Sequence, residues 1–130
     1  MRTMLALAAA YGRGPVPLTQ IAQRENISLA YLEQLIAALR RKGLVHSVRG
    51  ARGGYRLAQT PQEVTLGDVL RAAEESIGPV DCLSEDRQGA CCEREAECSV
   101  RPAWARLRSS MVDLLDSTTL ADLCQPVRGV

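Results

Sequence analysis

The sequence predicts a mainly α-helical protein with a small β-hairpin wing: a winged helix-turn-helix followed by a long C-terminal dimerisation helix. Three observations predict this fold class. Residues 28–57 read in direct succession as a helix, a helix stop and a glycine-rich basic hairpin. The positive charge is concentrated on the same stretch. Near the C-terminus, apolar residues recur at the three- and four-residue spacing of a long amphipathic helix.

The composition is that of one ordinary globular domain. A chain of 130 residues, 46% of them hydrophobic, can bury a core without disulfides. No apolar run reaches the length of a membrane span, and the first residues lack the cleavage site of a signal peptide. We therefore expect a cytoplasmic protein that does not bind membranes. In a reducing compartment, five cysteines are better explained as thiolates or metal ligands than as a disulfide framework.

Three helices are expected before the hairpin. The first spans about residues 1–11 and is ended by the glycines and prolines of 12–17. A short second helix stops near Glu25, and Ser28 suits the N-cap of a third. Gly43 follows the basic last turn of this third helix and suits a left-handed C′ position. The apolar face of the third helix consists of Leu32, Leu35, Ile36 and Leu39.

The hairpin is basic and rich in glycine. Strands are expected over 44–48 and 55–58, and the glycines between them can take positive φ angles and approach another surface closely. Residues 34–62 contain six Lys or Arg and no acidic residue, which leaves −5 for the remainder of a chain with net charge +1. Such focused charge is typical of a nucleic-acid-binding face. Arg49 or Arg52 could enter a minor groove, although a merely solvated hairpin is the alternative.

Two further helices are expected after the hairpin. Thr65 begins T-L-G-D, which predicts a capping box and a linking helix through Ala73. The last long helix starts at Ser99 or Pro102, and its apolar stripe predicts either ordinary core packing or a seam for a partner helix in a two-fold dimer. The seam residues are Trp104, Leu107, Met111 and Leu114. We expect one compact domain with three parts: the winged helix-turn-helix (1–62), the linker helix and cysteine-bearing sensing loop (63–98), and the dimerisation helix with its tail (99–130).

Four cysteines lie between these two helices: Cys82, Cys91, Cys92 and Cys98. Soft thiolates on one loop suit an iron-sulfur cluster, with zinc as the main rival. Cys98 also stands just ahead of a helix N-terminus, whose dipole favours a thiolate. The alternative is a set of buried or merely reactive thiols on a flexible loop. Cys124 and His46 are not expected to be ligands.

The stretch from Gly14 to Leu57 resembles the family of bacterial winged-helix regulators that includes the iron-sulfur cluster regulator IscR and the nitric-oxide sensor NsrR; its most specific parts are YLEQL and VRGxxGGY. The likeness continues through VTLGDVLRA, PVDC and STTLADL. It implies a homodimeric transcriptional repressor that binds a partly palindromic double-stranded DNA operator. Ala30 departs from the family pattern, so the operator sequence is not carried over. The candidate DNA-binding residues are Ser28, Tyr31, Glu33, Gln34, Arg40, Arg41, Arg49 and Arg52.

The same resemblance implies an iron-sulfur cluster, 2Fe–2S in preference to 4Fe–4S, which purified protein can lack. Its implied ligands are Cys82, Cys92 and Cys98, with Cys91 as substitute or fourth ligand. Cluster-assembly regulators use a histidine where this chain has Arg101, which stays protonated. The nitric-oxide sensor type uses a carboxylate near the start of the partner chain, but no Asp, Glu or His precedes Glu25 here. We expect the fourth position to be filled by residues ahead of Met1, by Cys91, by another loop group or by a small molecule.

Two alternatives stay open. The first is the same DNA-binding protein without a cluster, responding through thiol oxidation, zinc or a partner protein. The second is a small thiol enzyme or metal carrier that uses the cysteine loop. It is disfavoured because the chain has no C-x-x-C motif and no plausible acid–base pair, and we predict no catalytic residues.

Overall fold

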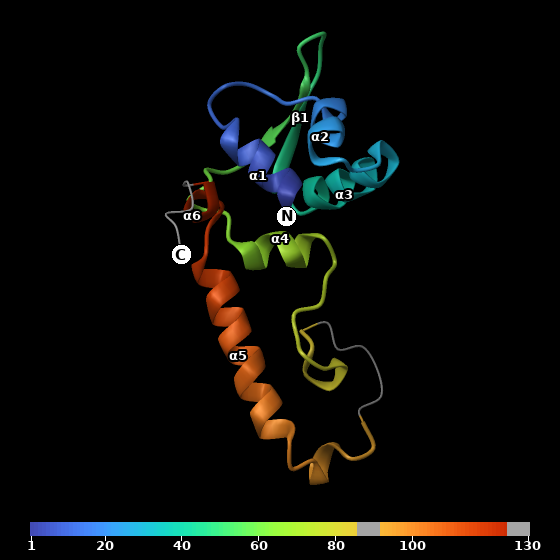
Figure 1. Ribbon diagram of the computed structural model, residues 1–130, viewed down its shortest axis with the longest axis vertical. Coiled ribbons are helices and arrows are strands. Elements are labelled where there is room, and N and C mark those ends of the chain that lie inside the picture. The colour runs from blue at the N-terminus through green and yellow to red at the C-terminus, as the bar shows by residue number, and fades with distance from the viewer. Residues whose placement is uncertain (86–91, 125–130) are drawn as a thin grey trace.

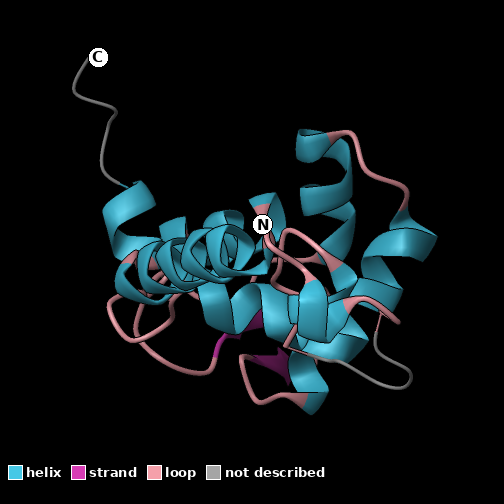
Figure 2. Ribbon diagram, turned by 90° about the horizontal axis from the view of Figure 1, so that it is seen from below, coloured by secondary structure: helices cyan, strands magenta, loops and turns pink. Residues whose placement is uncertain are grey.

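The computed structural model describes residues 1–85 and 92–124. In these ranges, helices make up most of the chain and the strands are confined to one hairpin (Figure 2). The predicted fold class is therefore confirmed. The elements in chain order are α1 (Arg2–Ala9), α2 (Leu18–Glu25), α3 (Leu29–Arg41), β1 (Val45–Val48), β2 (Gly54–Leu57), α4 (Leu66–Ala72), the 3-10 helices η1 (Asp81–Leu83) and η2 (Glu95–Glu97), α5 (Arg101–Ser117) and α6 (Leu120–Cys124).

The described chain forms a rounded upper part and an elongated lower part (Figure 1). Helices α1, α2 and α3 and the hairpin form the upper part, with α4 lying across its lower side. Helix α5 runs from the far end of the lower part back to the upper part, and α6 then packs against α1. The segment that carries η1 and η2 leaves from the other end of α4, so Cys82, Cys92 and Cys98 lie in the lower part of the molecule.

One hydrophobic core holds the upper part together. It receives side chains from α1, α2, α3, α4, both strands and α6. The third helix buries Leu32, Ile36 and Leu39 as its spacing predicted, whereas Leu35 is only half-buried. The largest fully buried side chains are Met4, Leu7, Ile21, Leu32, Ile36, Leu39 and Leu120.

Local hydrogen bonds set both ends of α3. The Ser28 hydroxyl accepts from the backbone N–H of Tyr31 at 3.3 Å, which confirms the predicted N-cap. At the other end, the N–H of Leu44 donates to the carbonyl of Leu39, and that of Gly43 to the carbonyl of Arg40, both at 3.0 Å. With Gly43 at φ +74°, these bonds form a Schellman motif. The motif turns the chain directly from α3 into β1.

The hairpin is antiparallel, with Val48 opposite Gly54. Its strands begin and end within one residue of the predicted bounds, and one more hydrogen bond, from Ala58 N–H to the Leu44 carbonyl at 3.0 Å, continues the pairing. A third segment joins it, because Val16 N–H donates to the Tyr55 carbonyl at 2.8 Å and Tyr55 N–H to the Val16 carbonyl at 2.9 Å. The sequence predicted only a helix stop around Val16. The wing is therefore anchored to the segment between α1 and α2.

Two threonine-based caps start α4 and α6. Thr65 and Asp68 form the capping box predicted for α4. Thr119 and Asp122 repeat the pattern at α6, a helix that the sequence analysis missed. The hydrogen bond from the Thr119 backbone holds the pKa of Asp122 below its usual range. In the part of the chain that the structure describes, no helix is long and apolar enough to cross a membrane.

Candidate functional site

The outer face of α3 is exposed at its N-terminal end. Because Leu32, Ile36 and Leu39 face the core, the exposed residues between them, Glu33, Gln34 and Ala37, point outward. Tyr31 is 58% exposed, and Ser28, Glu33 and Gln34 are exposed beside it. Following a short second helix, such a face has the geometry of a recognition helix, whose N-terminal residues reach base edges in a major groove.

The basic last turn of α3 lies at the opposite end of this face. Arg40 is exposed, and Arg41 Nη2 lies 3.6 Å from Glu74 Oε1, just beyond the end of α4. Both side chains of this pair are largely exposed, so it is worth about 0–1 kcal/mol and Arg41 remains accessible to a phosphate.

The wing loop presents Arg49 and Arg52 to solvent. A hydrogen bond from Gly53 N–H to the Gly50 carbonyl at 2.9 Å closes the loop, with Gly50 at φ +115°. A Cβ added to Gly53 would lie 2.3 Å from the Val48 carbonyl oxygen, so this glycine is required by the turn itself. On the strands, His46 faces Arg56 across the hairpin, and both are exposed.

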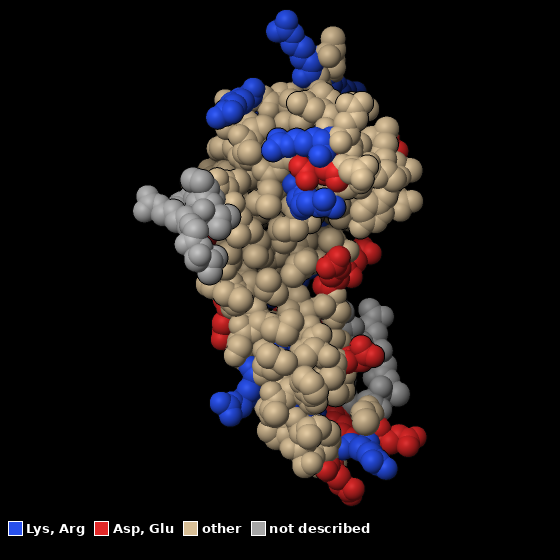
Figure 3. Space-filling model, viewed as in Figure 1, with Lys and Arg blue, Asp and Glu red and all other residues tan. Residues whose placement is uncertain are grey.

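Charge is divided along the long axis of the molecule. In the view of Figure 3, Lys and Arg side chains lie over the upper part, which carries the hairpin and the helix-turn-helix, and most Asp and Glu side chains lie below it. The acid-free run at 34–62 belongs to the upper part. An anionic partner is therefore favoured at the upper end.

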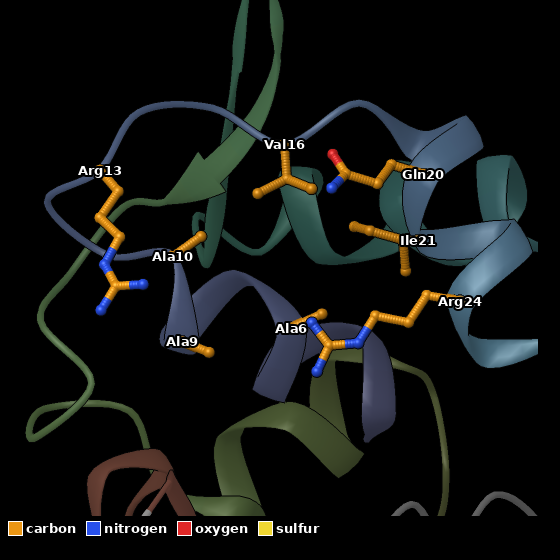
Figure 4. A pocket seen from close by; sticks show the side chains of 8 residues that line it. All are labelled: Ala6, Ala9, Ala10, Arg13, Val16, Gln20, Ile21 and Arg24. Carbon is orange, nitrogen blue, oxygen red and sulfur yellow. The ribbon is translucent and has the colours of Figure 1, made fainter.

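A pocket of about 180 Å³ lies between α1 and α2. Arg13 and Arg24 flank it from different sides (Figure 4). They add positive charge to the upper part, which the sequence analysis missed because both lie outside the acid-free run. The lining comes from α1, α2 and the segment between them, so the pocket is separate from α3 and the wing loop. Three small residues in and directly after α1 leave room for it: Ala6, Ala9 and Ala10.

Three of the described cysteines lie in the lower part. Cys82 lies in η1 and Cys98 directly follows η2; both are half-buried, whereas Cys92 is exposed. Cys91 lies outside the described residues. Within the described ranges, no three His, Cys, Asp or Glu side chains are grouped so that they could hold a metal ion. The donor chemistry suits a soft metal or cluster, but the described geometry does not gather Cys82, Cys92 and Cys98 into one site.

The position just ahead of α5 holds an ion pair. Arg101, in the first turn of α5, pairs with Glu95 of η2, and its backbone N–H donates to the Cys98 carbonyl at 3.2 Å. Arg101 thus fastens the cysteine-bearing segment to α5. The Cys98 position ahead of the helix agrees with the prediction, since α5 begins at Arg101.

A second charge cluster joins α4, the segment after η1 and α5. The Arg71 guanidinium donates through Nε and Nη2 to both oxygens of Glu85, at 2.8 and 3.0 Å. It also donates through Nη1 and Nη2 to both oxygens of Asp116, at 2.7 and 3.1 Å. These hydrogen bonds raise the pKa of Arg71 and hold the pKa values of Glu85 and Asp116 below their usual range.

Helix α5 leaves apolar side chains uncovered. None of its residues is fully buried in the single chain, although it packs against α4 and η1 on one side. Trp104 is 39%, Leu107 44% and Leu114 66% exposed, whereas Met111 is half-buried. Isolated exposed apolar residues are common, but a stripe of them along a helix is typical of an interface.

Comparison with known proteins identifies the family of this chain. The sequence model of the Rrf2 family, described as iron-dependent transcriptional regulators, matches residues 1–126. The chain belongs to the Rrf2 family of transcriptional regulators. The resemblance noted from YLEQL and VRGxxGGY is thereby confirmed, and the protein is a winged-helix transcriptional regulator.

Rrf2-family relatives match nearly the whole chain. It is 43% identical over 126 residues to the transcriptional regulator CymR of Bacillus subtilis (strain 168), covering 97% of this chain and 84% of CymR. It is 42% identical over 120 residues to IscR of Aliivibrio salmonicida (strain LFI1238), covering 92% of this chain and 69% of IscR. The structure of CymR, described as the global cysteine regulator of B. subtilis, superposes with a TM-score of 0.75 at 46% identity, covering 95% of this chain and 88% of CymR. The structure of T. potens IscR superposes with a TM-score of 0.74 at 38% identity, covering 98% of this chain and 82% of that IscR.

Proposed function

We propose that this Rrf2-family regulator acts as a homodimeric repressor that binds a partly palindromic DNA operator through α3 and the wing. The observation that carries the proposal is the pairing of an exposed N-terminal face on α3 with a basic wing loop on the same charged end of the molecule. Ser28, Tyr31, Glu33 and Gln34 are the proposed base-reading set, and Arg40, Arg41 and Arg52 the proposed phosphate contacts. The uncovered stripe on α5 is the proposed dimer seam.

Replacing Arg49 by alanine tests the proposed minor-groove contact. We expect operator affinity to fall by about 10- to 100-fold, as for loss of one specific contact, and affinity for random DNA to fall only a few-fold. Fluorescence anisotropy would measure both affinities. The operator duplex would be selected from a random library by the wild-type protein. Arg56→Ala, which removes another exposed charge from β2, is the matched control. Equal losses on operator and random DNA would reassign Arg49 to a phosphate contact.

We also propose that the cysteine-bearing segment is the sensing element. In the first form of this proposal, Cys82, Cys92 and Cys98 hold an iron-sulfur cluster, with Cys91 as the fourth candidate. The soft donor set and the family description as iron-dependent support it. When bound, such a group would supply a redox-sensitive link between residues on η1 and residues beside η2.

A second form needs no cluster and uses the thiols themselves. Two observations favour it: the described thiols are not gathered into one metal site, and CymR, described as a cysteine regulator, is among the similar structures. Exposed Cys92 and half-buried Cys82 and Cys98 would then be oxidised or modified directly.

Iron and acid-labile sulfide per chain, measured on protein purified without oxygen, separate the two forms. Stoichiometric iron and sulfide that disappear in Cys92→Ser or Cys98→Ser, but persist in Cys124→Ser, would establish the cluster. Cys124 is the control because it lies in α6, away from the loop. Protein that stays free of iron and sulfide after reconstitution would leave the thiol form.

A further inference from the structure

The Arg71 cluster joins elements that are distant in the chain. Glu85 is 14 residues and Asp116 45 residues from Arg71 in sequence, yet one guanidinium binds both carboxylates in a two-point manner. Planar two-point pairs of this kind are stronger and more directional than single ion pairs. Arg71 therefore acts as a clamp between the cysteine-bearing segment and the C-terminal end of α5.

Glu85 is the member of this cluster that belongs to the sensing side. It lies three residues after Cys82, and η1, which carries Cys82, packs against α5. A displacement of η1 would therefore pull directly on the Glu85 carboxylate. Asp116 has no such link, because it belongs to α5 itself.

A competing partner for Glu85 stands nearby on α5. Arg108 Nη2 lies 3.8 Å from Glu85 Oε1, at the outer limit of an ion pair. Arg108 Nε is buried and has no hydrogen-bond acceptor among the described residues. A buried donor without an acceptor is costly, so a move of Glu85 from Arg71 toward Arg108 would satisfy a donor at the same time as it breaks the clamp. The pair of arginines gives Glu85 two alternative partners.

The other side of the clamp leads to the DNA-binding end. Helix α4 buries Val69 and Ala72 in the core that also holds α3. The approach of α5 is close, because a Cβ on Gly67 would meet the Asp116 carboxylate and the Arg71 guanidinium. A change in the partners of Arg71 would therefore change how α5 packs against α4, and through α4 how the core packs against α3.

We propose that Glu85 is a latch that couples the chemical state of the cysteine-bearing segment to α4 and α5 by exchanging between Arg71 and Arg108. With Glu85 on Arg71, α4, η1 and α5 are clamped together. Modification of Cys82 displaces η1, moves Glu85 toward Arg108 and loosens the end of α4 that faces α5. The link to DNA affinity rests on the proposed function, whereas the latch itself is a property of the single chain. The hydrogen bonds from Arg71 hold the pKa of Glu85 below its usual range, so the carboxylate is charged at neutral pH while it is bound to Arg71.

Hydrogen exchange of the full chain tests the latch without DNA. Reduced protein would be compared with protein alkylated by N-ethylmaleimide. We expect alkylation to speed amide exchange in 66–72 and at the C-terminal end of α5 about fivefold or more, the lower end of typical coupling between sites. In Glu85→Gln the reduced protein should already exchange at the faster rate, and alkylation should add nothing.

Two variants separate the latch from a merely structural role. Arg108→Gln removes the alternative partner, so exchange in 66–72 should stay slow both before and after alkylation. A structural role alone would speed exchange in both Glu85→Gln and Arg108→Gln. Glu75→Gln removes an exposed carboxylate beyond the end of α4 and should behave as wild type. Alkylation that affects only residues 78–98 in the wild-type chain, or a wild-type response in Glu85→Gln, would overturn the latch.

DNA binding gives a separate readout. The ratio of duplex affinities before and after alkylation should be about fivefold or more in either direction for wild type and Glu75→Gln, and close to one for Glu85→Gln. A wild-type ratio in Glu85→Gln would overturn the coupling. A wild-type chain without salt-dependent DNA binding in either state would contradict the proposed function instead, and the exchange result would still decide the latch.

Discussion

Leu107→Glu is expected to lower affinity for an operator with two half-sites by about a hundredfold or more. Leu107 lies in the uncovered stripe of α5, where a second copy is proposed to pack. A carboxylate buried in that seam would be desolvated without a partner, so the dimer should dissociate. Each subunit would then bind its half-site alone and lose the roughly 10²- to 10⁴-fold advantage of linked binding.

Light scattering during gel filtration would give the oligomeric state, and anisotropy the affinities for whole and half operators. Ser109→Glu adds the same charge on the opposite side of α5, at an exposed position, and is the matched control. We expect it to remain dimeric. A dimeric Leu107→Glu protein with unchanged operator affinity would remove this stripe from the proposed interface.

Gly54→Ala is expected to destabilise the protein by roughly 3 kcal/mol, in the range of large core and backbone defects. A Cβ at this position would lie 2.4 Å from the Val16 carbonyl oxygen and 2.7 Å from the Pro17 nitrogen. Both are backbone atoms, so they cannot rotate aside. The hydrogen bonds that join Val16 and Tyr55 would have to lengthen, and Gly54 itself has φ +156°, which L side chains rarely adopt.

Urea denaturation would measure the free energy of unfolding for wild type, Gly54→Ala and a control. Gly12→Ala is that control, since Gly12 also has a positive φ of +78° but no atom within 4 Å of an added Cβ. Its free energy of unfolding should fall by only about 1–2 kcal/mol, the cost of placing an alanine in a left-handed backbone conformation. Equal losses in the two variants would show that the close approach to Val16 contributes nothing.

Structural features that depend only on nearby residues in the chain were predicted from the sequence. The Ser28 cap, the Gly43 stop and the Thr65–Asp68 capping box depend only on neighbours three to five residues away, and all three are confirmed. The burial of Leu32, Ile36 and Leu39 followed from the helical spacing of apolar residues in α3. The basic hairpin followed from glycines and charges that are adjacent in the chain.

One local signal was available and missed. Thr119 and Asp122 repeat the threonine-to-acid spacing of Thr65 and Asp68, and they cap α6 in the same way. Five residues are too few to show helical periodicity, so only the cap could have revealed this helix. Its fully buried Leu120 then completes the core beside α1, which no local pattern indicates.

The sequence by itself determined the family through its motifs. It also determined the five helices α1 to α5, the wing and the concentration of positive charge, because backbone caps, periodicity and composition act over a few neighbouring residues. Only the tertiary structure decided that Val16 anchors the wing, that Arg71 holds both Glu85 and Asp116, and that Arg101 fastens the cysteine-bearing segment to α5. In the sequence these charges look like ordinary solvated residues. Their partners depend on how the helices are placed relative to one another, which the packing of the whole core sets.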